Sequence, residues 1–271
     1  MKTKIVCLSV SLIALCLITS CQPKKSEVKK AVPVSTESLL TRKVKDDIIK
    51  VAYSLPTNTE TVNLINATGA AYLAGFTGQD MKTENLLTRN EKATAYGTLL
   101  FDLAYTHTYK QVESFSKLLK IFGTLTSELG FEELVQMQKN FQADYQEHKD
   151  NKDSLNVLVA NMLNKTNESI RNNGTAVDIS LVVAGAVLKS LNVITNITLF
   201  ATNPDKLIEV LKKQKAVVSS VCAILEKSPD DPDVSKLYKE LVPINDLFNS
   251  SETFNVQTVE QINKLTGFIT K

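Results

Sequence analysis

The segment from Ile179 to Ala201 places the strongest constraint on the fold, because it is the most apolar stretch after residue 21 and has to be buried. It can be buried either as a membrane span or as the central helix of a bundle. Lys189 and several amide and hydroxyl side chains interrupt it, and a charge near the centre of a membrane helix costs roughly 2.5 to 3.5 kcal/mol. We therefore expect a central helix packed on several sides, where Ala184, Gly185 and Ala186 let a neighbouring helix approach closely.

The rest of the chain carries apolar residues at helical spacing between short capping signals. From Thr108 onward, apolar residues recur every three or four positions until Gly130, which we expect to close that helix in a left-handed conformation. The chain has 9 Gly, 7 Pro and no Trp, a composition that favours helices over a β-sandwich. The sequence predicts an all-α protein, a compact multi-helix bundle of about eight to ten helices.

Capping residues and prolines give the expected limits of the first helices. The helix that opens at Ser35 should stop before Pro56. A second helix should run from near Thr59 to Gly75, and Asn90 is expected to cap the third.

The first 21 residues, MKTKIVCLSVSLIALCLITSC, have every part of a bacterial lipoprotein export signal. Lys2 and Lys4 supply the cationic start, and Ile5–Ile18 is an apolar stretch too short to span a membrane comfortably. The small residues before Cys21 let a signal peptidase reach the backbone, and the Cys21 thiol would accept the lipid. The signal peptide 1–20 is then removed; the alternatives are an ordinary secretory signal with an incidental cysteine, or a retained membrane anchor.

The exported chain is expected to divide into a lipidated flexible tether, residues 21–34, and an all-helical domain, residues 35–271. A two-part subdivision of the domain near Asn173 is the alternative. The expected location is the bacterial cell envelope, with the chain attached to the membrane through acyl chains. Position 22 is not Asp, which is compatible with the outer membrane, and no acidic cluster follows Cys21, which favours the periplasmic face.

Removal of the signal changes the charge of the protein. The full chain has 31 basic and 29 acidic residues, and Lys2 and Lys4 leave with the signal, so the exported chain is formally neutral. A neutral chain without a long basic block gives no electrostatic reason to expect nucleic acid as a partner. Two of the four cysteines leave as well, and Cys222 lies in an apolar helical context that predicts a buried, inert thiol.

The sequence motifs of common enzyme classes are missing. His107 and His148 are the only histidines, and no Cys/His cluster accompanies them, so neither a metal site nor a cofactor is expected. The chain also lacks GxSxG, GxGxxG and GxxxxGK[ST]. No residue is therefore assigned a catalytic role.

Asp102 has the most unusual context of the acids, because it lies inside the apolar run Leu99–Tyr105. Burial would raise its pKa, and carboxylates with shifted pKa values are enriched at functional sites. Tyr105 shares its helical face, and His107 follows closely. We take Asp102, Tyr105 and His107 as candidate ligand-binding or structural residues. The simpler alternative is a structural carboxylate that caps a neighbouring helix or binds a tyrosine hydroxyl.

Several short stretches together resemble an uncharacterised family of all-helical lipoproteins from Bacteroidetes. The matching residues are Ser54-Leu55-Pro56, Tyr96-Gly97 followed by Asp102-Leu103-Ala104-Tyr105, Asn151-Lys152-Asp153-Ser154-Leu155, and Ala184-Gly185 followed by Ser190-Leu191. The resemblance extends over about residues 54–202. It implies an envelope-anchored α-helical domain, and it carries no activity or catalytic residue to this chain.

Two functions from different classes remain open at this point. The first is a non-enzymatic binding or structural module that holds an envelope protein or a small ligand in a groove between helices. The second is an envelope enzyme, hydrolase-like, that uses Asp102 with a nearby tyrosine or with His107. The missing catalytic motifs favour the first, whose partners would be the membrane through lipid and an envelope protein or small ligand.

Overall fold

The computed structural model describes residues 36–148, 151–250 and 254–270, and residues 36–271 belong to one compact unit. The described residues are helical with no strand among them, which confirms the all-α class. Predictions for residues 1–34, including the signal peptide, the tether and lipidation at Cys21, lie outside the described residues.

The described part of the chain contains eleven α-helices and three short 3-10 helices. They are α1 (Thr36–Ser54), α2 (Asn58–Ala67), η1 (Ala74–Phe76), η2 (Thr83–Asn85), α3 (Arg89–Thr108), α4 (Val112–Glu128), α5 (Glu132–Glu147), α6 (Lys152–Asn173), α7 (Ala176–Phe200), α8 (Asp205–Lys212), α9 (Gln214–Leu225), α10 (Pro232–Ser250), α11 (Val256–Thr266) and η3 (Gly267–Thr270). Only Lys213 separates α8 from α9, and its own backbone is helical, with φ −63° and ψ −19°. These two therefore form one interrupted helix.

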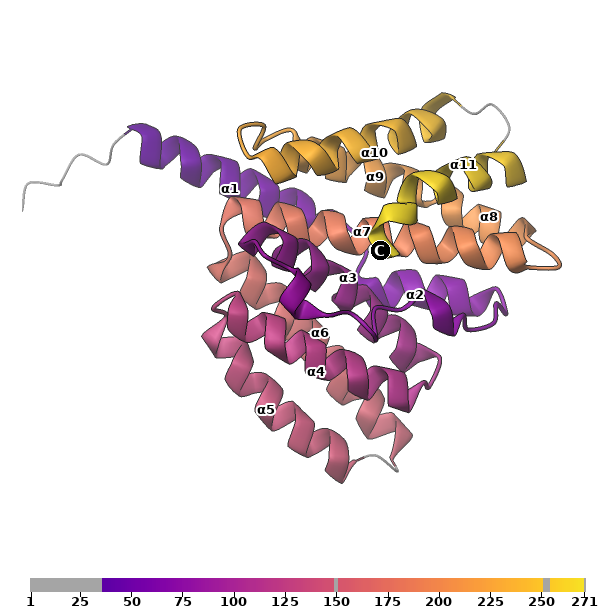
Figure 1. The fold of residues 1–271 in the computed structure, drawn as a ribbon, viewed down its shortest axis with the longest axis horizontal. Coiled ribbons are helices and arrows are strands. Elements are labelled where there is room, and N and C mark those ends of the chain that lie inside the picture. The colour runs from indigo at the N-terminus through magenta and orange to yellow at the C-terminus, as the bar shows by residue number, and fades with distance from the viewer. Residues whose placement is uncertain (1–35, 149–150, 251–253, 271) are drawn as a thin grey trace, which may run out of the picture. The chain divides into compact units, whose positions relative to one another are not determined.

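The helix α7 is the centre of the unit. It packs against α1, α3, α8, α9, α10 and α11, and Figure 1 shows α9, α10 and α11 on one side of it and α4, α5 and α6 on the other. It is the one described helix that is long and apolar enough to cross a membrane by length and composition, yet 83% of its most apolar window is buried inside the protein. The prediction of a central helix packed on several sides is confirmed.

The closest helix contact is between α3 and α7, and two glycines make it possible. A Cβ atom on Gly97 would overlap the carbonyl oxygen of Val182, and one on Gly185 would overlap the carbonyl oxygen of Thr94. The backbones of the two helices therefore touch directly, as was expected at Gly185. This contact brings the polar residues in the middle of α3 and α7 together.

The predicted end of the second helix is wrong. Helix α2 ends at Ala67 instead of continuing to Gly75, because the Thr68 hydroxyl donates to the carbonyl of Ile65 and Gly69 turns left-handed at φ 81°. The chain then runs as a mostly irregular segment, residues 68–88, which includes η1 and η2.

Asn90 is not the cap of the third helix. Thr88 caps α3 together with Glu91, each side chain bonded to the other's backbone N–H in a capping box. The Asn90 amide instead donates to Asp231 and to Asp233 at the start of α10. This side chain therefore ties two helices that are far apart in the sequence.

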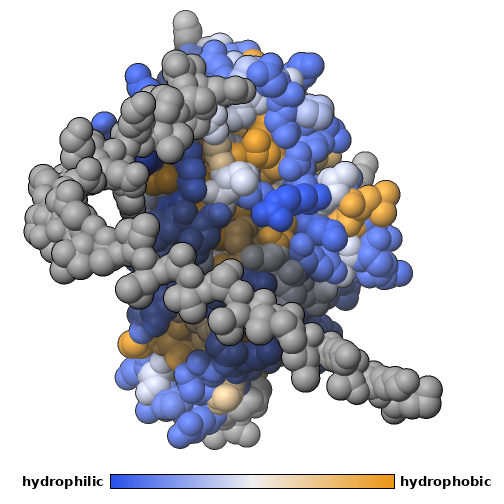
Figure 2. Space-filling model, turned by 90° about the vertical axis from the view of Figure 1, so that its left-hand side faces the viewer, coloured by the Kyte–Doolittle hydropathy of each residue, from blue (hydrophilic) through white to orange (hydrophobic). Residues whose placement is uncertain are grey.

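The surface is mixed in character. On the face in Figure 2, hydrophilic side chains cover most of the described surface and apolar ones occur at separate places. Among the most exposed large apolar side chains are Leu87 and Phe200. Apolar side chains are therefore scattered over this face and do not form one continuous patch.

Candidate functional site

The three residues singled out from the sequence lie on α3 but face three different environments. Asp102 contacts Lys189 and Gly78, Tyr105 belongs to an aromatic cluster, and His107 lines a pocket. The structure does not bring them together into one site. Each is therefore described separately.

Tyr105 has a structural role. Its hydroxyl accepts a hydrogen bond from the backbone N–H of Leu73 at 2.9 Å, and its ring packs on those of Tyr72 and Tyr109, with centroids 5.0 and 4.9 Å away. Burial raises the pKa of its hydroxyl, so it stays protonated. Tyr105 thus holds the irregular segment 68–88 against α3.

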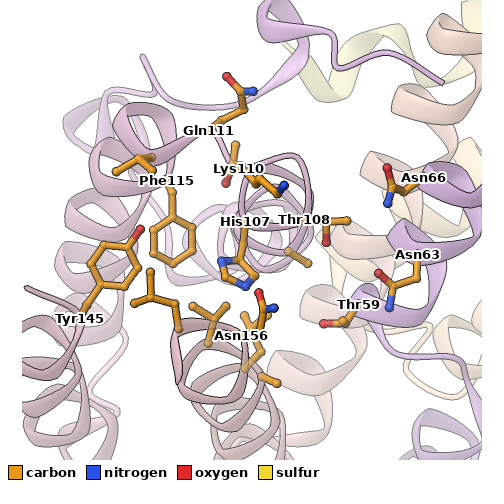
Figure 3. A pocket seen from close by; sticks show the side chains of 17 residues that line it. Thr59, Asn63, Asn66, His107, Thr108, Lys110, Gln111, Phe115, Tyr145 and Asn156 are labelled. Carbon is orange, nitrogen blue, oxygen red and sulfur yellow. The ribbon is translucent and has the colours of Figure 1, made fainter. Parts of the chain in front are cut away.

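His107 lines a pocket of about 720 Å³ between α2, α3, α4, α5 and α6, which we call the His107 pocket. In Figure 3, the side chains from α2 lie on one side of His107, and Phe115 and Tyr145 lie on the other. Most of the polar side chains that line it are uncharged. They include Thr59, Asn63, Asn66, Gln111, Tyr145 and Asn156.

The wall of the His107 pocket combines polar and apolar side chains, and it contains no carboxylate among the described residues that line it. Burial lowers the pKa of His107, and a hydrogen bond with Asn156 only partly opposes this. The imidazole is therefore neutral at pH 7, with one nitrogen able to donate and the other to accept. Lys110 is the one lysine among the lining residues.

Lys110 has an unusual backbone for a lysine. Its φ is 58°, which makes it the only non-glycine residue with positive φ in the described part of the chain. Here α3 ends in a Schellman motif, in which the N–H of Lys110 donates to the carbonyl of His107 and that of Gln111 to Thr106. The same motif ends α4, but there Gly130 takes the left-handed position, as predicted, with φ 74°.

Asp102 forms a buried ion pair with Lys189 of α7. The distance from Asp102 Oδ2 to Lys189 Nζ is 3.5 Å, and their side chains are 0% and 3% exposed. The same oxygen accepts a hydrogen bond from the N–H of Gly78 at 2.8 Å, while Oδ1 is buried without a partner. Burial raises the pKa of Asp102 to about 6, although Lys189 and Gly78 oppose this shift.

This pairing differs from the structural alternative that the sequence suggested. Asp102 neither caps a helix nor binds a tyrosine hydroxyl, because the glycine contact between α3 and α7 places it against Lys189 instead. The sequence did contain a usable indication. Asp102 and Lys189 are each a charge inside an apolar helical run, and two such charges of opposite sign satisfy each other when buried.

Asp102 and His107 do not meet in one site, so the structure does not assemble this pair of the enzyme hypothesis. Asp102 is held by Lys189, whereas His107 bonds with Asn156 in a different pocket. Among the described residues, no three His, Cys, Asp or Glu side chains gather as a metal site. Cys222 is buried, as predicted, and burial raises the pKa of its thiol to about 11.

No family model, curated protein or solved structure matches this chain. The resemblance to lipoproteins of Bacteroidetes therefore stays a prediction from the sequence.

Proposed function

We propose that this protein is a non-enzymatic binding module of the bacterial cell envelope, anchored through an acylated Cys21, which takes a small polar ligand into the His107 pocket. The observation that carries this proposal is the pocket itself, because uncharged polar side chains from α2, α3 and α6 converge in it. A concave site with a few converging polar groups is the usual form of a small-molecule site. Asn63, His107 and Asn156 would make the first contacts.

The lining of the pocket indicates the chemistry of its ligand. Amide and hydroxyl side chains such as Asn63, Asn66 and Thr59 both donate and accept hydrogen bonds, so they suit a ligand that carries hydroxyl and amide groups. Phe115 and Tyr145 supply aromatic surface for its apolar parts. With no carboxylate on the described wall, the ligand is neutral or anionic, as in a sugar with acetamido or carboxyl groups.

The membrane anchor and location follow from the sequence alone. The lipoprotein signal supports export and lipidation at Cys21, and the residues after it favour the periplasmic face of the outer membrane. In this arrangement a ligand bound in the pocket would be kept at the membrane surface. The missing catalytic motifs and the separation of Asp102 from His107 support a binding role over catalysis.

Titration followed by NMR tests the proposal. Acetamido sugars, uronic acids and dipeptides are added to the protein, and the amide signals of Asn63, His107 and Asn156 are recorded. We expect one of these classes to shift them in a saturable way. The substitution Asn156→Ala should weaken that binding about tenfold or more, because it removes both a ligand contact and the support of His107.

The matched control is Asn140→Ala, which changes an exposed asparagine of α5 that does not line the pocket. It should leave binding unchanged. If none of the three classes shifts the pocket signals at millimolar concentration, the proposed function is wrong.

A further inference from the structure

A second pocket, of about 730 Å³, lies beside the buried Asp102 and Lys189 pair and is independent of the His107 pocket. Its walls come from the irregular segment 75–86, from α3 and α10, and from η3. Lys189 of α7 also lines it, and we call it the Lys189 pocket.

The ammonium of Lys189 has unused hydrogen-bonding capacity. It carries three N–H groups, but among the described residues its one ion-pair partner is Asp102 Oδ2 at 3.5 Å. A well-formed bond between an ammonium and a carboxylate is about 2.7 to 2.9 Å long. The Lys189 side chain is only 3% exposed but lines the pocket, so its remaining N–H groups can donate to a molecule bound there.

Part of the wall of the Lys189 pocket is apolar. Met81, Leu86, Leu237, Phe268 and Ile269 line the pocket and offer contact surface to a hydrocarbon or aromatic group.

The acids of the pocket leave Lys189 available. Asp80, Glu91 and Asp233 also line it, but Glu91 accepts hydrogen bonds from the N–H groups of Leu87 and Thr88. Asp233 accepts one from Asn90, and Asp80 is exposed at the surface.

We propose that the Lys189 pocket binds a small carboxylic acid with an apolar body. Its carboxylate accepts hydrogen bonds from the Lys189 ammonium, and its body lies against Met81, Leu237 and Phe268. The acid supplies a second acceptor for Lys189 beside Asp102. It also joins the segment 75–86 to α10, which are the two walls that face the pocket.

An amine or a neutral alcohol fits this pocket less well. Of the acids that line the pocket, Glu91 and Asp233 already accept hydrogen bonds, and Asp80 is exposed to water, which weakens its attraction for an amine. An alcohol would accept a hydrogen bond from Lys189, but this bond lacks the additional strength that a charged acceptor gives. The pocket therefore selects the anion.

The test compares hexanoate, hexanol and hexylamine, each titrated into the full-length chain in a mild detergent, with the amide signals of Gly78 and Met81 followed by NMR. We expect hexanoate to shift both signals in a saturable way and to bind at least about tenfold more tightly than the other two probes. The same probe should leave the amide signals of Asn63 and Asn156 unchanged, which separates this site from the His107 pocket.

Two variants test the role of Lys189. The double substitution Asp102→Asn with Lys189→Met removes both buried charges, and such replacements are generally tolerated by the fold. It should weaken hexanoate binding about tenfold or more. The control Lys236→Met removes an exposed lysine of the same pocket and should change binding less than about twofold, because its charge is screened by water.

Three results would overturn the proposal. One is hexanoate binding that the double variant leaves unchanged, another is tighter binding of hexylamine or hexanol, and the third is the absence of any shift at Gly78 and Met81. A circular dichroism spectrum and a cooperative thermal unfolding transition check that the double variant is folded.

Discussion

Lys110 and Gly130 occupy the same position in the two Schellman motifs that end α3 and α4, yet only one of them is glycine. A left-handed conformation strains a residue with a Cβ atom by roughly 1 to 2 kcal/mol, whereas glycine adopts it freely. The strained Lys110 lies at the edge of the His107 pocket. It is the one positively charged side chain among the described residues that line the pocket, since His107 is neutral. Strain of this kind is typical of functional positions.

The substitution Lys110→Gly should raise the free energy of unfolding by about 0.5 to 1 kcal/mol, because the relief of strain exceeds the entropy that glycine adds to the unfolded chain. Urea unfolding measures this change. The mirror variant Gly130→Ala should lower the free energy of unfolding by about 1 kcal/mol. A destabilised Lys110→Gly protein would show that the lysine side chain itself stabilises the turn.

Nothing in the sequence around Lys110 indicates its conformation. Gly130 could be predicted as a helix end because glycine is the usual residue at this position. Lysine gives no such indication, so the left-handed conformation of Lys110 becomes visible only in the structure.

The buried Asp102 makes the stability of the protein depend on pH. Burial raises its pKa to about 6 in the folded chain, whereas an unfolded aspartate titrates near 3.9. Between these values the folded state binds the proton more tightly, so the free energy of unfolding falls as the pH rises from about 4 to about 6, by roughly 3 kcal/mol in total. Stability contributed by this proton is fully present below pH 4 and lost above pH 6.

Urea unfolding between pH 4 and pH 7 measures this dependence. Asp102→Asn imitates the protonated acid and should remove the decline, whereas Asp80→Asn, at an exposed acid, should retain it.

Asp178 affects stability in a different pH range. Its burial is outweighed by hydrogen bonds from Arg89 and Thr175, which lower its pKa, so its contribution is lost only as the pH falls below about 4.

At the scale of single elements, the crossing of α3 and α7 depends on Gly97 and Gly185. A methyl group at either position would overlap a backbone carbonyl oxygen of the other helix, and a backbone cannot move aside as a side chain can. We expect Gly97→Ala and Gly185→Ala each to lower the free energy of unfolding by about 3 kcal/mol or more, as in severe overpacking. Thermal or urea unfolding measures the loss.

The control for this prediction is Gly267→Ala. This glycine follows α11 with helical φ and ψ of −62° and −18°, and a Cβ atom there would meet no atom within 4 Å. Its substitution should leave stability unchanged or raise it by up to about 1 kcal/mol. If Gly97→Ala were equally harmless, the two helices would have to lie further apart than described.

The helix ends could be predicted where one residue type determines the backbone geometry, and less well where a turn interrupts an apolar pattern that continues past it. The end of α1 before Pro56 and the end of α4 at Gly130 depend on backbone geometry, which the residue type determines. The end of α2 depends on the turn at Thr68 and Gly69, which interrupts an apolar pattern that continues to Leu73. The periodic pattern alone could not show that the apolar residues after Ala67 pack as an irregular segment and not as a helix.

The candidate site residues could also be predicted only in part, because their partners are far away in the sequence. Asp102 and His107 were found because polar residues stand out in an apolar helix, but their partners Lys189 and Asn156 come from α7 and α6. Five residues along an α-helix also turn the side chain to a different face, since each residue turns by about 100°. One helix therefore places Asp102 and His107 in two separate environments, and only the packing of its neighbours shows this.

At the scale of the whole molecule, α7 connects the questions of fold and membrane attachment. Its composition alone fits a membrane span, but within the described chain it is surrounded by α1, α3, α9, α10 and α11. Lys189 at its middle is neutralised by Asp102, which explains how a charge can lie in so apolar a helix. If the attachment comes entirely from lipid at Cys21, the helical unit should need no membrane.

This expectation can be tested by phase separation in a cloud-point detergent. A chain that begins at Ser35, exported behind a cleavable secretory signal, should partition into the aqueous phase, because α7 is covered by other helices and no lipid is attached. The full-length chain should enter the detergent phase and take up radioactive palmitate, and Cys21→Ala should abolish the labelling. Detergent partitioning of the shorter chain would show that α7 or another helical face contacts the membrane directly, and palmitate labelling that survives Cys21→Ala would show that Cys21 is not the lipid attachment site.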